Sequence, residues 1–372
     1  MYGPKVSGIG NYVKNLIDNL LDIDHENEYV IFLLKEGFES FSPKQQNVKK
    51  VLVNCHWYTW KEQWKYWRIL EKEKTDIMHF PNFNVPIFFT RKFVVTIHDM
   101  TPWQFPGQKV SESAVRWLAY AMVFNSAVKR AEKIITVSQY SKSEIIKKYA
   151  KAAGKISIVY NGVSGSFQRV DNYGIIENIK RKYKIVKPYI FFIGVWRDHK
   201  NIPGLIHTFT ILKEMHKMDI QLVLGGENTH QYEDIDKAID ESPVMTDILQ
   251  TGFIPDGELP ALYSAAEATV IPSFVEGFGL HAIESILCGT PVVGSLATSL
   301  PEVVGDLAVY FDPHNPEDMA KKIKRVLDDP FIKKIIYEKR DKFVQKYSWR
   351  TSAVKTLEIY KNTQNEKKKK NK

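Results

Sequence analysis

Short apolar runs alternate with helix-like stretches along almost the whole chain, and this alternation limits the possible folds more than any other feature. Runs such as YVIFLL (29–34) and FVVTIHD (93–99) are short and continuously apolar, which predicts buried strands. Strands that alternate with helices form parallel sheets with helices on both faces. The chain is therefore predicted to be an α/β protein. The other predicted strands are 77–80, 133–138, 158–162, 189–194, 220–226, 248–254, 268–273 and 291–295.

The alternating pattern stops and restarts once, around a polar stretch at residues 164–187 that we interpret as a linker. This division predicts two Rossmann-like doubly wound domains, an N-terminal one over residues 1–165 and a C-terminal one over residues 185–347. Domains of this kind bind ligands at the carboxyl ends of their strands. We therefore expect the two domains to face each other across a ligand-binding cleft.

The charge of the chain is +9, but five of its lysines lie in the last six residues, 367–372. Without them the chain is only mildly basic, which argues against a nucleic-acid-binding surface. Residues 365–372 are predicted to be a disordered basic tail, with an electrostatic tether to an anionic bilayer as the alternative.

Cys55 and Cys288 are far apart and lack metal-ligand spacing, and no apolar run approaches the ~20 residues that span a bilayer. We expect a cytoplasmic protein, or one peripheral on the inner face of the membrane.

The strongest functional signal lies in residues 271–284, IPSFVEGFGLHAIE. A strand is predicted to end at Ser273, a turn with two glycines follows, and a helix begins near Leu280. Backbone N–H groups at the positive end of a helix bind anions, and glycines let a bulky ligand approach. The predicted anion-binding residues are Gly277, Phe278, Gly279 and Leu280.

Two glutamates, Glu276 and Glu284, lie in the same segment. A carboxylate repels a diphosphate, so both side chains are expected to reach past it to hydroxyl groups. We assign sugar hydroxyls to Glu276 and ribose hydroxyls to Glu284. The alternative is structural: Glu276 as a helix N-terminal charge and Glu284 as a surface residue.

The setting of these glutamates, P-S-x-x-E-G-F-G-L-x-x-x-E, together with CGTPVV (288–293) and SLPEVVG (299–305), resembles the group-one family of retaining glycosyltransferases with the GT-B fold. The resemblance implies a metal-independent enzyme that needs no cofactor. It would move a hexose from a nucleotide-diphosphate sugar to a saccharide or lipid-linked saccharide, in surface polysaccharide synthesis. Mannose from GDP-mannose is the first candidate, and UDP-sugars follow.

The resemblance extends to residues outside this segment. Gly8 and Gly10 match the family's N-terminal glycine loop over the donor phosphates, and His98 matches a histidine that contacts the transferred sugar. Lys200 matches a lysine that binds the donor diphosphate, with Arg197 as an assisting cation. The corresponding structural alternatives are a plain turn, a structural histidine and a solvated lysine.

The two ends of the chain are also interpreted through this resemblance. Only six residues precede the glycine loop, so the family's first N-terminal strand is apparently missing. Residues 160–163 (YNGV) resemble an interdomain turn, and residues 348–364 resemble a terminal helix that crosses back onto the N-terminal domain.

Several alternatives stay open from the sequence. A nucleotide-sugar 2-epimerase of similar fold and a non-catalytic saccharide- or nucleotide-binding relative are the rival functions. Two Asp-x-Asp triplets, 22–24 and 234–236, lie in polar helix-flanking sequence, so no metal site is predicted. Four tryptophans recur at helical spacing and predict either core packing or a platform for a sugar or membrane; they are Trp57, Trp60, Trp64 and Trp67.

Overall fold

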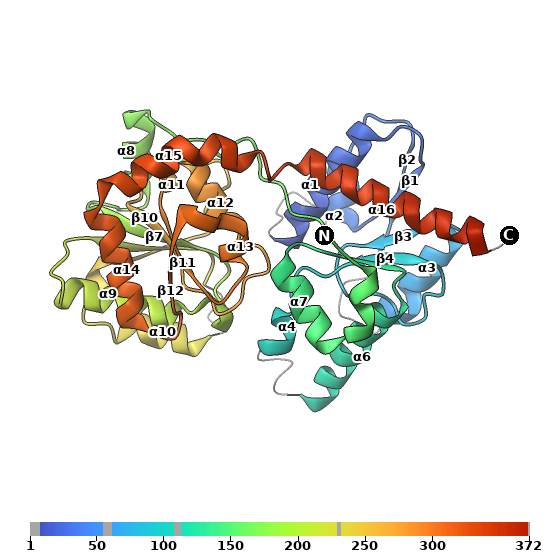
Figure 1. Cartoon of the computed structure of the whole chain (residues 1–372), viewed down its shortest axis with the longest axis horizontal. Coiled ribbons are helices and arrows are strands. Elements are labelled where there is room, and N and C mark those ends of the chain that lie inside the picture. Colours follow the sequence, from blue (N-terminus) through green and yellow to red (C-terminus); the bar gives the residue numbers. More distant parts are fainter. Residues whose placement is uncertain (1–7, 55–61, 108–112, 229–231, 371–372) are drawn as a thin grey trace. The chain divides into compact units, whose positions relative to one another are not determined.

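The computed structural model describes residues 8–54, 62–107, 113–228 and 232–370. The chain divides into two compact units (Figure 1). Unit 1 comprises residues 1–102, 106–162 and 348–372, and unit 2 comprises residues 103–105 and 163–347.

Unit 2 is built on one parallel sheet in the order β12-β11-β10-β7-β8-β9. Its first strand lies in the middle, and the chain adds β8 and β9 on one side before it crosses to add β10, β11 and β12 on the other. This is the doubly wound order, and its switch point lies between β7 and β10. The strands are β7 (Tyr189–Ile193), β8 (Gln221–Gly225), β9 (Ile248–Gly252), β10 (Ala268–Ile271), β11 (Val292–Ser295) and β12 (Ala308–Phe311).

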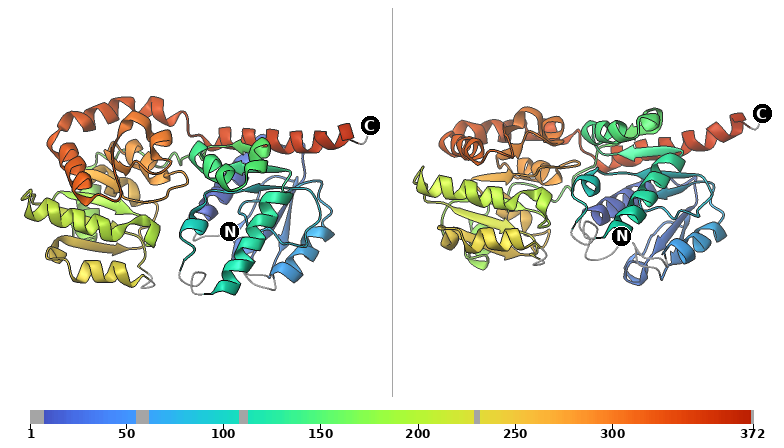
Figure 2. Two further views of the ribbon diagram at one scale, coloured as in Figure 1. Left: turned by 60° about the horizontal axis from the view of Figure 1, so that its bottom comes forward. Right: turned by 90° about the horizontal axis from the view of Figure 1, so that it is seen from below.

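Helices cover both faces of this sheet (Figure 2). One face carries α9 (Ile202–Glu214), α10 (Glu233–Asp240) and α14 (Pro316–Asp328). The other face carries α8 (Tyr173–Lys182), α11 (Leu259–Ala265), α12 (Leu280–Leu287), α13 (Leu300–Val304) and α15 (Pro330–Val344). Ile190, Leu222 and Val270 from the strands are fully buried against the first layer. Each such side chain contributes about 1.5–3 kcal/mol of transfer free energy.

Unit 1 contains a parallel pair, β1 (Tyr29–Leu33) and β2 (Val48–Leu52), and a parallel sheet in the order β3-β4-β5-β6. The sheet strands are β3 (Met78–Phe80), β4 (Phe93–Thr96), β5 (Lys133–Thr136) and β6 (Ile156–Ile158). The helical segments are α1 (Ile9–Ile23), α2 (Lys35–Ser40), η1 (Glu62–Tyr66), α3 (Trp67–Lys72), α6 (Ala114–Arg130), α7 (Gln139–Lys148), η2 (Ala150–Lys155) and α16 (Trp349–Lys370). Helix α4 (Thr101–Gln104) begins in unit 1 and ends in unit 2.

The last helix, α16, packs along α1 inside unit 1. Trp349 and Ala353 of α16 are buried with Tyr12, Leu16 and Leu20 of α1. Polar groups continue this contact into the sheet. The Tyr360 hydroxyl lies 2.5 Å from Nδ1 of His79, whose Nε2 lies 2.8 Å from Thr96 Oγ1. Burial lowers the pKa of His79 to about 3, so its imidazole is neutral in this network.

Apart from the short unit 2 segment 103–105, the chain passes between the two units at residues 162–163 and again at 347–348. These two crossings lie side by side, because Val163 N–H donates to the Tyr347 carbonyl at 3.1 Å. A Cβ added to Gly162 would lie 2.2 Å from the Trp349 nitrogen. Glycine at position 162 is therefore required by the closeness of the two chain segments.

Some elements differ from the sequence predictions. The stretch interpreted as a linker contains α8, which packs on α11 in unit 2. The strand predicted over residues 133–138 ends at Thr136, and Ser138 instead caps α7, because its Oγ accepts the Ser141 N–H at 3.0 Å. Helix α16 continues through Lys370 into the tail that was expected to be disordered. Lysine and glutamate are good helix formers, and extending an existing helix adds one hydrogen bond per residue.

Two predictions fall wholly or partly outside the described residues. Trp57 and Trp60 lie there, whereas Trp64 falls in the π-helical segment η1 and Trp67 begins α3. The first described element is α1, and the residues before Gly8 are not described. The tryptophan stripe and the missing first strand therefore stay predictions.

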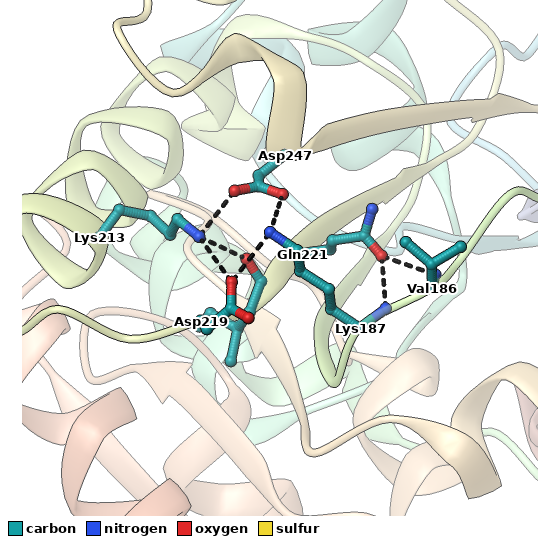
Figure 3. A network of polar contacts seen from close by, with 7 residues as sticks. Val186, Lys187, Lys213, Asp219, Gln221 and Asp247 are labelled. Atoms are coloured by element: carbon teal, nitrogen blue, oxygen red, sulfur yellow. Dashed lines mark hydrogen bonds and ion pairs between the residues drawn. The ribbon is translucent and has the colours of Figure 1, made fainter.

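The amino ends of the unit 2 strands β7, β8 and β9 are held by an ion network (Figure 3). Asp247, before β9, accepts from Lys187 at 2.9 Å and from Lys213 at 2.6 Å. Asp219, before β8, lies 2.9 Å from the same Lys187 but has a side chain that is 78% exposed. Gln221 Oε1 accepts the backbone N–H groups of Val186 and Lys187, just before β7.

We predict that Asp247→Asn lowers the melting temperature of the protein more than the exposed control Asp219→Asn does. Burial raises the pKa of Asp247, but the bonds from Lys213 and Lys187 outweigh burial and hold the pKa below its ordinary 3.8. The stabilisation is therefore complete above pH 3.8 and is lost as pH falls through the lower folded-state pKa. Thermal melts at pH 7 and at acid pH measure both effects, and equal melting temperatures for the two variants would contradict the prediction.

Candidate active site

The predicted site residues fall into two groups, one in each unit, and each group lies at the carboxyl end of its sheet. The unit 1 group consists of Gly8, Gly10 and His98. The unit 2 group follows strands β7 and β10 and consists of Arg197, Lys200, Glu276, Gly277, Phe278, Gly279, Leu280 and Glu284.

Lys200 and Glu276 meet at the switch point of the unit 2 sheet. Lys200 follows β7, Glu276 follows β10, and these strands are neighbours. Lys200 Nζ donates to Glu276 Oε1 at 2.5 Å, and the two side chains are only 15% and 14% exposed. Ser273 Oγ donates to the same oxygen at 2.8 Å. The pair joins the two loops that flank the ligand-binding crevice of a doubly wound sheet.

The charge on Glu276 is maintained by its partners. Burial raises the pKa of Glu276, but the charge of Lys200 and the hydrogen bonds from Lys200 and Ser273 outweigh it, so the pKa lies below its ordinary value. Glu276 is therefore an ionised carboxylate near neutral pH. It can accept hydrogen bonds from hydroxyl groups, and Lys200 supplies the cation beside it.

Asn201 fixes the loop that carries Lys200. Its backbone has φ of 51°, a left-handed conformation that asparagine and glycine tolerate. Its side-chain amide donates to the Pro272 carbonyl at 3.2 Å and to the Pro313 carbonyl at 2.8 Å. The loop after β7 is thereby tied to the loop after β10, which positions Lys200 beside Glu276.

Gly279 forms the turn from which α12 begins. Its φ is 82°, and a Cβ at this position would lie 2.4 Å from Leu300 Cδ2, so only glycine fits. The first turn of α12 carries no acidic side chain, and its leading backbone N–H groups have no intrahelical acceptors. Phe278 differs from its neighbours, because its ring is 5% exposed and packs edge-on against Tyr347. Its side chain belongs to the core, which leaves only its backbone for ligand binding.

Glu284 is buried on α12 and is only 7% exposed, so the alternative reading of it as a surface residue is wrong. The Tyr263 hydroxyl donates to Glu284 Oε2 at 3.0 Å, and His281 Nδ1 lies 2.9 Å from the same oxygen. Burial and the nearby carboxylate raise the pKa of Tyr263 well above 10, so its hydroxyl keeps its proton. One oxygen of Glu284 is thus held in a defined orientation.

In unit 1, the glycine loop lies next to His98. Gly8 precedes α1 with φ of 50°, and its carbonyl accepts the Tyr12 N–H at 3.1 Å. The Tyr12 ring then packs edge-on against His98 with centroids 4.7 Å apart. Gly10 is buried in the first turn of α1. The glycine loop and His98, which the sequence analysis expects to bind the donor from the N-terminal unit, are therefore in contact through Tyr12.

His98 has a defined tautomer. Its Nε2 lies 3.0 Å from the Pro81 carbonyl, which can only accept, so Nε2 carries the hydrogen. Burial lowers the pKa of His98 against the opposing effects of Pro81 and Asp99, so the ring is neutral. Nδ1 is then a hydrogen-bond acceptor. This arrangement suits binding of a hydroxyl group and does not suit proton donation by His98.

Four residues that support the site were given no role from the sequence: Ser273, Asn201, Tyr263 and His281. His281 and Ser273 each lie three residues from the glutamate they contact, a spacing that could have indicated them. The contact of Tyr263 with Glu284 joins two helices and has no signal in the sequence. Arg197 is exposed at the start of the loop that carries Lys200.

The Asp-x-Asp triplets have structural roles. Asp24 accepts from the Glu26 N–H and from the Tyr29 hydroxyl at the end of α1, and Asp236 accepts from Asn228. Within the described residues, no group of three or more His, Cys, Asp or Glu side chains is arranged to hold a metal ion. In the same part of the chain, no helix has the length and apolar character needed to cross a membrane.

The architecture matches that of solved glycosyltransferases. A sucrose-phosphate synthase from Thermosynechococcus elongatus aligns with a TM-score of 0.75 at 19% identity, over 96% of this chain and 94% of that one. Anabaena HepE, solved in complex with UDP and glucose, aligns with a TM-score of 0.74 at 16% identity, over 97% and 98% of the two chains. The fold is therefore GT-B, with two Rossmann-like units, as predicted.

Sequence comparison gives the family. The family model described as "Glycosyl transferases group 1" matches residues 175–347, and the one described as "Glycosyltransferase Family 4" matches residues 6–166. The O-antigen chain mannosyltransferase B of Escherichia coli is 31% identical, over 78% of this chain and 76% of that protein. An uncharacterized glycosyltransferase of Methanocaldococcus jannaschii is 27% identical over 97% and 96% of the two chains. The chain belongs to the group 1 glycosyltransferases, which confirms the resemblance based on the Glu276 segment.

Proposed function

We propose that this glycosyltransferase is a retaining, metal-independent hexosyltransferase that uses a nucleotide-diphosphate sugar, with GDP-mannose as the first candidate donor. The observation that carries the proposal is the Lys200–Glu276 pair at the switch point of the unit 2 sheet. Its cation suits a diphosphate, and its carboxylate suits the hydroxyls of a sugar. Two relatives support mannose as the transferred sugar, since the E. coli and Salmonella typhimurium proteins are named as O-antigen chain mannosyltransferases. UDP-sugars are the second candidates, because HepE was solved with UDP and glucose.

In the proposed reaction, the bond between the anomeric carbon and the diphosphate breaks, and negative charge collects on the departing nucleotide. Lys200, Arg197 and the amino end of α12, at Gly277 to Leu280, stabilise this charge. Glu276 and His98 Nδ1 accept hydrogen bonds from the sugar, and Glu284 accepts them from the ribose. The acceptor oxygen bonds to the anomeric carbon on the face from which the phosphate departs, and the leaving phosphate takes the acceptor's proton, so the configuration of the sugar is retained. Gly8 and Gly10 leave room for the phosphates.

The acceptor is proposed to be a saccharide or lipid-linked saccharide in surface polysaccharide synthesis, on the basis of the O-antigen mannosyltransferases among the relatives.

A donor screen tests the function directly. Purified protein with EDTA is incubated with GDP-mannose, UDP-glucose or UDP-N-acetylglucosamine, and nucleotide release is measured. Release from one donor, lost in Glu284→Ala, supports the proposal. Deuterium incorporation at C2 of the sugar without transfer would instead identify an epimerase, and binding without turnover would identify a non-catalytic relative.

The proposed ribose contact predicts a specific effect of Tyr263→Phe. Removing this hydroxyl takes one hydrogen bond from Glu284 Oε2, so nucleotide affinity should fall about three- to tenfold while kcat changes little. Tyr183→Phe is the matched control. The Tyr183 hydroxyl also donates to a carboxylate, that of Glu258 at 2.7 Å, but this pair is not part of the proposed site. Calorimetric titration with the nucleotide measures the difference. Equal affinities for the two variants would argue against a ribose contact through Glu284.

A further inference from the structure

Tyr12 of α1 joins two residues at the carboxyl end of β4. Its hydroxyl lies 3.0 Å from Thr96 Oγ1, and its ring packs edge-on against His98, which follows β4. Tyr12 and Thr96 are both buried, so their hydroxyl groups depend on protein partners. Burial raises the pKa of Tyr12 to about 12, so its hydroxyl keeps its proton near neutral pH. One neutral side chain thus contacts both the last residue of the strand and the histidine beyond it.

A chain of hydrogen bonds continues from Tyr12 to the last helix. Thr96 Oγ1 also lies 2.8 Å from His79 Nε2 on β3, and Nδ1 of the same ring lies 2.5 Å from the Tyr360 hydroxyl on α16. Because the His79 ring is neutral, one of its nitrogens donates and the other accepts, so the hydroxyl groups on its two sides are linked. The Tyr12 ring also lies 6.0 Å from the ring of Trp349 on α16. The position of Tyr12 is therefore set by α16 as well as by α1.

Contacts from α1, α7 and the segment after β3 orient His98. Its Nε2 donates to the Pro81 carbonyl at 3.0 Å, and its backbone carbonyl accepts the Ser141 hydroxyl at 2.8 Å. These two contacts fix one ring atom and the backbone, but the ring could still tilt about the bond to Pro81. The edge-on contact with Tyr12, at an interplanar angle of 86°, opposes this tilt. Nδ1 of His98, the proposed acceptor for a sugar hydroxyl, is thereby held in place.

We propose that Tyr12 is a positioning residue for His98, and that α16 acts on His98 through the hydrogen-bond chain that ends on Tyr12. The inference rests on the proposed contact of His98 with the sugar and adds the residues that orient it. Tyr12 acts through His98 and is assigned no contact with the sugar. Two titratable neighbours also act on His98: the charge of Asp99 raises its pKa, and His79 on β3 stays neutral beside it. Neither of them restrains the tilt of the ring as Tyr12 does.

The nitrogen–proton NMR spectrum of the histidine side chains tests the positioning, because it reports tautomer and protonation without a ligand. The signal of His98 is identified by its loss in His98→Gln. In the parent we expect the Nε2–H tautomer and a ring that stays mostly neutral at pH 6.5, since burial lowers the pKa of His98. In Tyr12→Leu the ring should titrate at higher pH and show both neutral tautomers. Tyr12→Phe keeps an aromatic ring in the core, should show a smaller change, and carries the test where the leucine variant does not fold.

Tyr12→Phe and Tyr360→Phe test the hydrogen-bond chain from its two ends. Each variant removes one hydroxyl group, and both should shift the His98 signal in the same direction. The double variant should shift it no further than Tyr12→Phe alone, because the two changes break the same chain. Tyr29→Phe is the matched control and should leave the signal unchanged, since the Tyr29 hydroxyl donates to Asp24 at the carboxyl end of α1. A Tyr360→Phe variant with an unchanged His98 signal would remove α16 from the proposal.

Kinetic measurements separate this inference from the proposed function. With a donor that is turned over, Tyr12→Leu should lower kcat about tenfold and leave the affinity for free nucleotide within about twofold, because His98 is assigned to the sugar. An unchanged His98 signal in Tyr12→Leu would overturn the inference. An equal change in Leu20→Ala, a buried neighbour on α1, would also overturn it, because general loosening of the core would then explain the effect. If no donor is turned over, the proposed function fails, and the NMR spectra still decide whether Tyr12 positions His98.

Discussion

Replacing Lys200 with methionine is expected to slow glycosyl transfer by about a hundred- to a thousandfold. Methionine keeps much of the aliphatic stem but removes the cation that donates to Glu276 at 2.5 Å. In the proposed reaction this cation stabilises the charge on the departing diphosphate, so its loss should appear in kcat. Single-turnover measurements at saturating donor report it directly. The control is Lys339→Met, which removes a lysine from an exposed pair with Asp306.

The variants of Lys200 also separate catalysis from folding. In Lys200→Met the buried carboxylate of Glu276 loses its cation and keeps the hydrogen bond from the Ser273 hydroxyl, so burial should raise the pKa of Glu276 and lower stability. The double variant Lys200→Met, Glu276→Gln removes both charges and should regain stability without regaining activity. Near-normal turnover in Lys200→Met would disprove the electrostatic role. Restored turnover in the double variant would show that the single change acted by destabilising the site.

Gly226→Ala is expected to lower the free energy of unfolding by about 3 kcal/mol or more. Gly226 follows β8 with φ of 113°, which alanine rarely adopts, and a Cβ there would lie 1.9 Å from the Gly194 carbonyl oxygen. The neighbour is backbone, so a change of rotamer cannot relieve the clash. Gly194 directly follows β7, in the segment that leads to Lys200, so the same change should also weaken donor binding.

Gly165→Ala is the matched control, because this unit 2 glycine has ordinary φ and no atom within 4 Å of an added Cβ. Urea denaturation of both variants measures the difference in unfolding free energy. A loss in Gly226→Ala of less than about 1 kcal/mol would mean that the turn after β8 can rearrange at little cost.

The sequence predicted the fold class well because unit 2 strands such as β7, β8 and β10 are mostly apolar and almost entirely buried. It missed β2, whose central Lys49 and Lys50 interrupt the apolar run, and β12, which is only partly buried. It also treated α8 as linker, since that helix contains no fully buried residue. Half-buried elements are harder to predict, because some of their side chains face the core and others face solvent, so their sequences mix apolar and polar residues.

The candidate site was less predictable than the fold. The Glu276 and Glu284 segment is local in sequence, so its turn and helix could be anticipated. The pairing of Lys200 with Glu276 spans 76 residues and depends on β7 lying next to β10. The Tyr263 contact with Glu284 and the tautomer of His98 likewise depend on tertiary neighbours. Their roles toward a ligand stay predictions that the variants above test.

The position of α16 has a consequence for synthesis on the ribosome. The core of unit 1 includes Trp349 and Ala353, and Tyr360 closes the His79 network, so unit 1 cannot be completed before the end of the chain emerges. Nearly all of unit 2 comes from the continuous segment 163–347, which is released earlier. The half of the protein that is translated first is therefore the half that finishes folding last, and a ribosome that stalls shortly before Trp349 leaves unit 1 without its closing helix.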